Sequence, residues 1–291
     1  MSSGSKADTA PVDPTTDEAA TEPFLLAASL SGQADATWAR AAAPFVDGAL
    51  LGGIALDAAT RTAAADLVSR GREEFLPEDP IAWIDDQLRA VADAPLRPGV
   101  NVRSTTPARI REAAAVCVRH DAVCEINAHC RQPELRAAGC GEALLAEPAR
   151  LASLVAAAAD TGVTTSVKVR AEVPDVDLAA VAGRVADAGA DWLHVDAMDS
   201  EPVVATIDAG GLGVVANNGV RDRETVAEYA QRGADAVSVG RPSTDPVVLA
   251  RVAAAVDDWR AGRLDTGDAD HHTGNGRDVD RRDHPAQTEV R

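Results

Sequence analysis

Side chains that could do chemistry stand at the ends of five short apolar runs. They occur in the segments Asn127-Ala-His129-Cys130-Arg131, Lys168-Val-Arg170, His194-Val-Asp196, Asn217-Asn218-Gly219 and Gly240-Arg241-Pro242. A thiol can be an acid or a nucleophile, and ammonium and guanidinium groups bind anions. Glycine-rich turns bring backbone amides close to a phosphate. Together these segments indicate a phosphate-bearing ligand held next to an acid or a nucleophile.

Lys168 is the sharpest of these signals. Apart from Lys6, every other basic residue among the 28 is arginine, yet this lysine stands inside an apolar run. An unpaired ammonium is costly to bury, although a lysine at a strand end can reach water with its charged tip. Because arginine serves the surface elsewhere in this chain, we expect Lys168 to bind an anionic ring or phosphate, or to form a Schiff base.

Cys130 and His194 each admit a functional and a structural interpretation. Cys130 follows His129 outside the apolar run, so it could be a catalytic acid or nucleophile at the rim of a site, or neither. His194 has apolar neighbours and could equally be a core histidine with satisfied hydrogen bonds. Cys117 and Cys124 fall within a helical and a strand pattern, which predicts inert core residues.

The polar segments need elements that bring them together, and the apolar runs supply these. The runs are continuous rather than alternating, as expected of strands that are covered on both faces. Eight strands are predicted, at Phe24–Ala28, Ala49–Ile54, Gly99–Val102, Ala122–Asn127, Thr165–Val169, Trp192–Asp196, Gly213–Asn217 and Ala236–Gly240.

Alanine-rich segments of helical length separate these strands. Examples are Pro107–Val118, Pro148–Asp160, Leu178–Ala188, Arg223–Gln231 and Asp245–Trp259. Strand and helix alternating eight times over predict an α/β fold of the (β/α)8 TIM-barrel type, whose active site lies at the carboxyl ends of the strands. The alternative is a doubly wound open sheet, which is disfavoured because no GxGxxG follows the first strand.

The two ends of the chain have a different composition. Residues 1–21 are polar, and residues 261–291 contain almost no apolar side chains. We therefore expect an N-terminal disordered tail over 1–21, one barrel domain over 22–260 and an acidic disordered tail over 261–291. The pair His271-His272 could bind a metal, but its place in the second tail favours solvated histidines. We expect no metal site, since the cysteine spacings match no zinc motif.

The charge balance is extreme, with 46 acidic against 28 basic residues and a net charge of −18. Such a chain argues against a free-standing nucleic-acid binder. The interpretation that we favour is adaptation to high salt, where the Debye length falls to about 3 Å and net charge says little about an RNA partner. No apolar leader or membrane-spanning run is present, so a cytoplasmic protein is expected.

The motifs resemble those of the dihydrouridine synthase family, FMN enzymes that reduce a uracil ring in transfer RNA. The resemblance spans roughly residues 24–250 and is best at Glu125-Ile-Asn127-Ala-His-Cys130, followed by Gly139-Cys-Gly141-Glu-Ala143-Leu-Leu145-Ala-Glu-Pro148. The strand segment Ser-Val-Lys168-Val-Arg170 and the strand-six His194 are similar as well. The segments Val-Ala-Asn217 and Gly233-Ala-Asp-Ala-Val-Ser-Val-Gly240-Arg241 resemble the family's phosphate site.

The resemblance implies roles for particular residues. FMN would lie across the barrel mouth, with NAD(P)H as the reductant. Cys130 would protonate C5 of the uracil, with Lys168 and His194 near the flavin ring as further catalytic residues. Contacts to FMN are implied for Ala28, Asn101, Asn127, Lys168, His194, Asn217, Asn218, Gly219, Gly240 and Arg241.

The sequence also departs from the family pattern. Asn101 stands where a glutamine is usual, Arg131 follows the cysteine in place of proline, and the strand-six run His-Gly-Arg-Thr-Arg is His194-Val-Asp-Ala-Met here. Only polar sequence follows Trp259, where a helical RNA-binding domain is usual. The substrate could thus be a uridine in transfer RNA or a free pyrimidine. Two alternatives stay open: a cofactor-free lyase or isomerase using Lys168 on a phosphorylated substrate, and a barrel that only binds a flavin or nucleotide.

Overall fold

Parallel strands form a closed barrel in the computed structural model, which describes residues 22–207 and 210–264. Each strand pairs with the next along the chain, and β1 pairs with β8. Within the described residues the strands are β1 Phe24–Ala27, β2 Gly48–Ala55, β3 Arg97–Arg103, β4 Val123–Asn127, β5 Thr165–Arg170, β6 Trp192–Asp196, β7 Gly213–Asn217 and β8 Ala236–Val239. The predicted TIM barrel is confirmed, and the predicted strands match these within a few residues.

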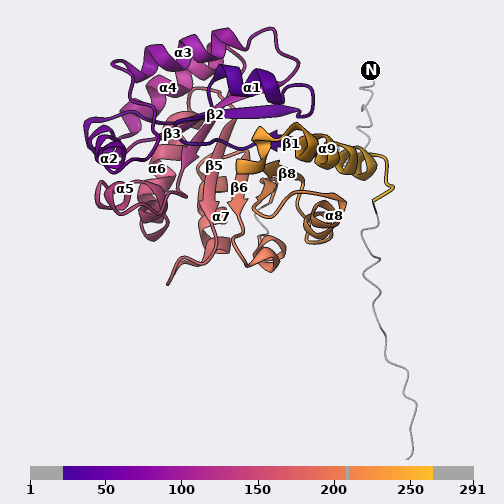
Figure 1. Ribbon diagram of the computed structural model, residues 1–291. Helices are drawn as coiled ribbons and strands as arrows, with labels where there is room; N and C mark the ends of the chain where they lie inside the picture. Colours follow the sequence, from indigo (N-terminus) through magenta and orange to yellow (C-terminus); the bar gives the residue numbers. More distant parts are fainter. Residues whose placement is uncertain (1–21, 208–209, 265–291) are drawn as a thin grey trace, which may run out of the picture.

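Helices surround the barrel (Figure 1). The α-helices of the described chain are α1 Ala36–Ala42, α2 Ala58–Ser69, α3 Pro80–Ala90, α4 Pro107–Arg119, α5 Pro133–Ala137, α6 Pro148–Ala159, α7 Leu178–Asp187, α8 Arg223–Gln231 and α9 Pro246–Arg260. Proline at the first turn and aspartate caps start most of them, as the sequence indicates. The Asp222 side chain, for example, accepts a hydrogen bond from the Thr225 amide at the start of α8.

The alternation of strand and helix is less regular than predicted. Two α-helices, α2 and α3, lie between β2 and β3. Between β6 and β7 the described residues form only a 3-10 turn, η2 Glu201–Thr206. Similar turns, η1 Gly141–Ala146 and η3 Arg241–Thr244, precede α6 and α9. The crossover after β6 therefore departs from the predicted pattern, while the strand order of the barrel is unaffected.

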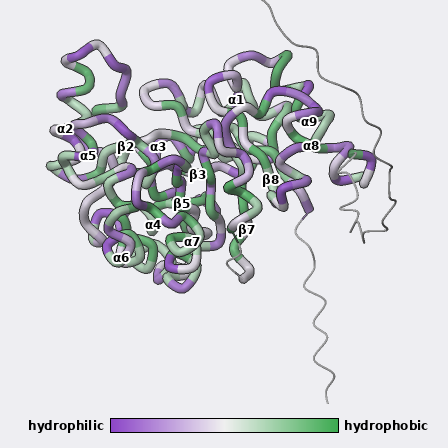
Figure 2. Tube along the Cα trace, turned by 90° about the horizontal axis from the view of Figure 1, so that it is seen from below, coloured by the Kyte–Doolittle hydropathy of each residue, from purple (hydrophilic) through white to green (hydrophobic). Residues whose placement is uncertain are grey.

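Side-chain direction explains which residues meet inside the barrel. Successive residues of a strand point to opposite sides, so Ile126, Val167 and Val195 pack in the large apolar cluster with residues of the helices. The hydropathy view shows apolar segments through the middle of the molecule and hydrophilic ones at its periphery (Figure 2). The other row of each strand faces the barrel axis. At its lower end this row forms a small apolar plug that includes Leu26, Leu50, Val123, Val215 and Ala236.

Above the plug the inward row becomes polar. Strand register places Lys168 of β5 directly between Asn127 of β4 and His194 of β6. Likewise Asn217 of β7 lies between Asp196 of β6 and Ser238 of β8. The strand pairing therefore gathers the residues singled out in the sequence at the carboxyl end of the barrel.

The described chain reaches slightly beyond the predicted domain limit of residue 260. Arg263 pairs with Asp258, and Leu264 is buried against the core. The predicted tails, including His271 and His272, otherwise lie outside the described residues. In the described part of the chain, no helix is both long and apolar enough to cross a membrane.

Candidate active site

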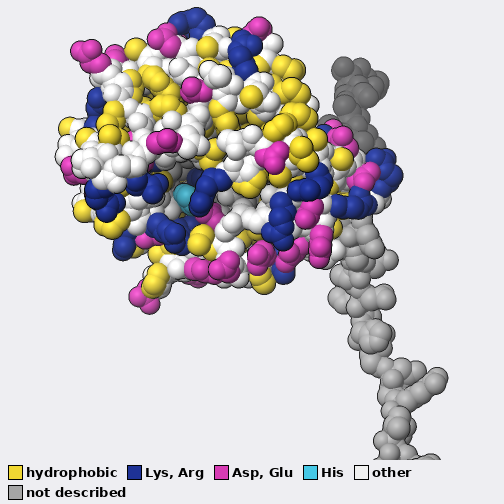
Figure 3. Space-filling view, viewed as in Figure 1, with side chains coloured by type: hydrophobic (Ala, Val, Ile, Leu, Met, Phe, Trp, Pro, Cys, Tyr) yellow, Lys and Arg dark blue, Asp and Glu magenta, His cyan; other side chains and the backbone are white. Residues whose placement is uncertain are grey.

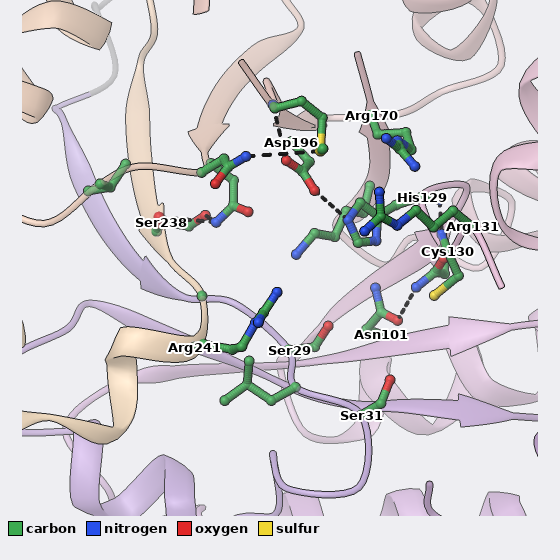
Figure 4. Close-up of a pocket in the computed structure, with 18 of the residues that line it drawn as sticks. Ser29, Ser31, Asn101, His129, Cys130, Arg131, Arg170, Asp196, Ser238 and Arg241 are labelled. Atoms are coloured by element: carbon green, nitrogen blue, oxygen red, sulfur yellow. Dashed lines mark hydrogen bonds and ion pairs between the residues drawn. The ribbon is translucent and has the colours of Figure 1, made fainter. Parts of the chain in front are cut away.

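A cavity of about 840 Å³ opens at the carboxyl ends of the strands (Figure 4). Most of the candidate site residues line it: Asn101, Asn127, Cys130, Lys168, Asn217, Asn218, Gly219, Gly240 and Arg241. Ala28 and His194 do not. Both are completely buried: Ala28 adjoins the lining residue Ser29, and His194 lies beneath the cavity. Direct contact of these two residues with a cofactor stays a prediction.

The cavity is strongly cationic although the chain is strongly acidic. Seven of the described residues that line it are arginine or lysine, and one, Asp196, is acidic. Basic side chains gather around this hollow, where a histidine is visible (Figure 3). An excess of positive charge inside a cleft concentrates anionic ligands there. The cavity is therefore suited to an anionic ligand.

Lys168 is the most informative of these cations. Its side chain lines the cavity although the residue is only 4% exposed. Within residues 22–207 and 210–264 its ammonium has no hydrogen bond or ion pair, whereas most arginines of the same region meet a carboxylate. A buried, unpaired ammonium is expensive unless a ligand supplies the missing acceptor. The position of Lys168 is therefore suited to contact with an anion or an electron-rich ring.

A chain of hydrogen bonds supports the floor of the cavity from below. Asn127 donates from Nδ2 to Asn101 Oδ1 (2.9 Å), and Asn101 donates to Glu125 Oε1 (2.7 Å). The other carboxylate oxygen of Glu125 lies 2.6 Å from His194 Nδ1 and also accepts a bond from Ser166. Four neighbouring strands are thereby fixed at one level.

The same chain continues across the barrel to the opposite wall. His194 Nε2 lies 2.7 Å from the Ser238 hydroxyl, whose oxygen accepts a hydrogen bond from Asn217 Nδ2 (2.6 Å). Burial and the Lys168 ammonium lower the pKa of His194. Burial raises the pKa of Glu125, but His194, Lys168 and the bond from Asn101 together lower it to about 2. A neutral imidazole that donates to an ionised Glu125 fits both directions, and His194 thus acts as a structural link.

The loop that carries Cys130 is held rigidly. Asn127 Oδ1 accepts hydrogen bonds from the backbone amides of both His129 (3.1 Å) and Cys130 (3.0 Å). From the other side, the Glu142 amide donates to the Cys130 carbonyl (2.9 Å). Gly141 packs so closely on that carbonyl that a Cβ would collide with it. The conspicuous Gly-Cys-Gly segment therefore serves to position the cysteine.

Positive charge surrounds the Cys130 thiol. Arg103, at the end of β3, is buried and paired with Glu74 at 2.6 Å. Burial raises the pKa of Cys130, but Arg103 and a hydrogen bond with His129 outweigh burial and lower it to about 6. Thiolates stabilised in this way react readily with electrophiles. The surroundings of Cys130 therefore favour its thiolate form.

His129 is itself part of an ion pair. Its Nε2 lies 2.6 Å from Asp196 Oδ2 across the mouth of the barrel. Burial lowers the pKa of His129, but the bonds with Asp196 and Cys130 outweigh burial and raise it. Burial also raises the pKa of Asp196, but the contact with His129 outweighs burial and lowers this pKa to about 2. Both contacts of His129 therefore favour the protonated form of the imidazole.

The low pKa of Cys130 leads to a prediction about alkylation. A thiol is alkylated as the thiolate, so iodoacetamide should modify Cys130 with a rate that rises through a midpoint near pH 6. Cys140 is an internal control, because burial raises its pKa to about 12. Mass spectrometry of the two peptides measures both rates. Equal rates at pH 7 would contradict the electrostatic description of Cys130.

The remaining cysteines have no comparable surroundings. Cys117 lies on α4 and Cys124 on β4, both are buried, and neither lines the cavity. A hydrogen bond with Cys117 and burial raise the pKa of Cys124. No cluster of three or more His, Cys, Asp or Glu suited to a metal ion occurs in the part of the chain that the structure describes.

The far side of the cavity offers space for a phosphate. Gly219 after β7 and Gly240 after β8 both open onto free space, because no neighbouring atom lies within 4 Å of the place that a Cβ would take. Asn218 has a positive φ of 87°, and its side chain accepts from the Gly219 amide (3.0 Å). Arg241 lines this corner, and within the described residues its guanidinium has no partner. Such a corner is typical of phosphate sites after strands 7 and 8 of barrels.

Comparison with known proteins places the chain in a family. A family model for dihydrouridine synthases matches residues 74–270. The chain belongs to the dihydrouridine synthase family. An uncharacterized protein of Methanocaldococcus jannaschii is 28% identical over 203 residues, which cover 66% of this chain and 78% of that protein. The family resemblance found in the motifs is confirmed.

Two solved structures share the fold. A FabK mutant of Thermotoga maritima superposes with a TM-score of 0.50 and 15% identity, over 77% of this chain and 63% of that one. The 3-hexulose-6-phosphate synthase of Salmonella typhimurium gives a TM-score of 0.50 and 14% identity, over 82% and 99%. At these identities the likeness concerns the barrel alone.

Within this dihydrouridine synthase barrel, several residues of the site were not predicted from the sequence. Glu125 and Ser238 link the buried chain, and Arg103 faces Cys130. An acidic residue inside the apolar run Val-Cys-Glu-Ile-Asn is a usable signal for Glu125. His129 and Asp196 are conspicuous in the sequence, but only the fold shows that they form a pair. Asp196 occupies the position of an arginine in the family's strand-six run.

Proposed function

We propose that this protein is an FMN-dependent oxidoreductase that reduces the C5–C6 double bond of a uracil ring. The family supports an oxidoreductase of this type. The observation that carries the cofactor assignment is the buried ammonium of Lys168, which lies in a cationic cavity and has no hydrogen bond or ion pair with any residue that the structure describes. Lys168 would face the electron-rich flavin ring, and the corner formed by Gly219, Gly240 and Arg241 would hold the phosphate. Bound FMN would supply a hydride to C6 of the substrate.

The protein's own groups would complete the reduction. Addition of a hydride at C6 leaves negative charge at C5, which requires a proton from an acid within reach. Cys130 Sγ lies at the cavity wall, on a loop that is fixed by Asn127 and Gly141. Delivery of its proton to C5 gives the dihydrouracil and a thiolate, which Arg103 stabilises. The reductant that renews the flavin is proposed to be NAD(P)H.

The direct test is a single-turnover reaction. The FMN-loaded protein is reduced with light, then mixed without oxygen with uridine, uridine nucleotides or unmodified transfer RNA. The expected result is flavin reoxidation together with a product that is heavier by two hydrogens and lacks uracil absorbance. A flavin that stays reduced with every one of these substrates would contradict uracil reduction. The active substrate would distinguish a transfer RNA enzyme from one that acts on a free pyrimidine.

The alternative of a lyase or isomerase rests on the same lysine. Lys168 is buried beside an anion-binding cavity, which would also suit a Schiff base with a phosphorylated carbonyl substrate. That mechanism has no use for Cys130 or for the charges arranged around it. Borohydride reduction in the presence of such a substrate would trap a covalent adduct on Lys168 only if the alternative is correct.

Arg241 gives a prediction for the phosphate corner. Arg241→Ala should weaken FMN binding about tenfold, as expected for one lost charge-assisted hydrogen bond, and should leave riboflavin binding unchanged. Titration of flavin fluorescence measures both affinities. Arg184→Ala, on α7 and away from the cavity, is the matched control. An equal loss of affinity for riboflavin, which has no phosphate, would show that Arg241 does not bind the phosphate of FMN.

A further inference from the structure

Cys130, His129 and Asp196 form a continuous row on one wall of the cavity (Figure 4). The imidazole bonds to Asp196 Oδ2 through Nε2 at 2.6 Å. His129 also adjoins Cys130 in the chain, both line the cavity, and His129 contributes to the lowered pKa of the thiol. Because Nε2 faces the carboxylate, Nδ1 is the ring nitrogen that is left for exchange with another group. A cysteine, an imidazole and a carboxylate in this order can exchange a proton along the row.

Hydrogen bonds fix both the backbone and the ring of His129. Asn127 fixes the His129 backbone, and Asp196 fixes the ring. Asp196 is anchored in turn, since its Oδ1 accepts a hydrogen bond from the Met198 amide (3.2 Å). The side chain of Asp196 is 13% exposed, against 30% for that of His129. The ring is therefore oriented toward the thiol and still reached by water, from which it can recover a proton.

The charges around the thiol favour one distribution of the proton. Arg103 and His129 face the sulfur as cations, while Glu74 opposes them but is already paired with Arg103. Lys168 faces His129 from β5 and disfavours its protonation, while the thiolate and Asp196 favour it. Cys140 is the other thiol near Arg103, and burial keeps it protonated. These charges thus favour a thiolate beside an imidazolium over a thiol beside a neutral imidazole.

We propose that His129 holds the proton that Cys130 delivers, and that Asp196 is the positioning residue that keeps His129 charged. The inference rests on the proposed function, because it concerns the acid of that reaction. The imidazolium transfers its proton to Cys130 Sγ, and the thiol formed gives it to C5 as the hydride reaches C6. The substrate gains one hydride and one proton, the thiolate is restored, and neutral His129 takes up a proton from solvent.

The test begins with the thiol and does not require turnover. The alkylation rate of Cys130 is measured against pH in the wild type, in His129→Asn and in Asp196→Asn. Loss of the imidazolium should raise the midpoint from near pH 6 by about one unit or more. Asp196→Asn should raise it by less. The matched control is His120→Asn, which removes a histidine paired at 2.8 Å with Asp85, away from the cavity.

Turnover supplies the second readout. In the single-turnover assay, uracil reduction by His129→Asn should be slower, and added imidazole should accelerate this variant but not the wild type. A midpoint that is unchanged in both variants, or a rate that imidazole leaves unaltered, would overturn the assignment to His129. Failure of the proposed function has a different signature, because no uracil would be reduced while the shift in alkylation persists. Flavin retention and the melting temperature establish that each variant is folded.

Discussion

Cys130→Ala is expected to abolish uracil reduction while leaving the flavin bound and reducible. Removal of a general acid typically lowers the rate by about 10²- to 10⁴-fold. Hydride transfer from FMN would then lack its coupled proton, because no other thiol lines the cavity within the described residues. Single-turnover flavin reoxidation with substrate measures the loss, and reduction of the flavin by NAD(P)H measures what is retained.

The matched control for this variant is Cys140→Ala. Cys140 belongs to the same small apolar cluster as Cys130, yet it does not line the cavity. Both substitutions remove one sulfur from that cluster, so their effects on stability should be similar. Equal rates of uracil reduction in the two variants would refute the assignment of the proton donor to Cys130.

Lys168→Met is expected to produce a folded protein that has lost most of its affinity for flavin. Loss of one partner from a buried, hydrogen-bonded charge contact costs about 2–5 kcal/mol, or at least about thirtyfold in affinity. Folding should be little affected, because within the described residues the ammonium has no hydrogen bond or ion pair to lose. Methionine keeps the unbranched apolar stem and lacks only the terminal ammonium.

Flavin titration and thermal unfolding, taken together, measure these two effects. Arg184→Met, on α7, controls for loss of a positive charge elsewhere on this acidic chain. If Lys168→Met binds FMN as tightly as the wild type, Lys168 does not bind the flavin, and the lyase alternative is favoured. A variant that fails to fold would show that the ammonium supports the barrel itself, through Glu125 below it.

The fold and most of the cavity residues could be predicted from the sequence because both depend on local patterns. Continuous apolar runs separated by helical segments determine a parallel barrel, and a parallel barrel brings all strand ends to one face. Hence Lys168, Asn217 and Arg241 line one cavity although they are far apart in the chain. The irregular crossover after β6 could not be predicted, since a short loop can replace a helix without changing the strand pattern.

The charges that act on Cys130 could not be predicted in the same way. Arg103 packs closely on Gly53 of β2, where a Cβ would lie 3.1 Å from Arg103 Nε. His129, just after β4, meets Asp196 at the end of β6, and the two residues are 67 positions apart along the chain. Such pairs depend on strand register and side-chain direction, and neither can be derived with this precision from one sequence without the structure. The burial of His194 beneath the cavity has the same origin.

The most direct test of this account is the visible absorption spectrum of the protein purified in molar KCl, followed by release and identification of any chromophore. The account predicts the two absorption bands of an oxidised flavin, a released chromophore that is FMN, and restoration of both after removal and readdition of FMN. A colourless protein that takes up no added FMN would contradict the account, and Lys168 would then be examined as a Schiff-base residue.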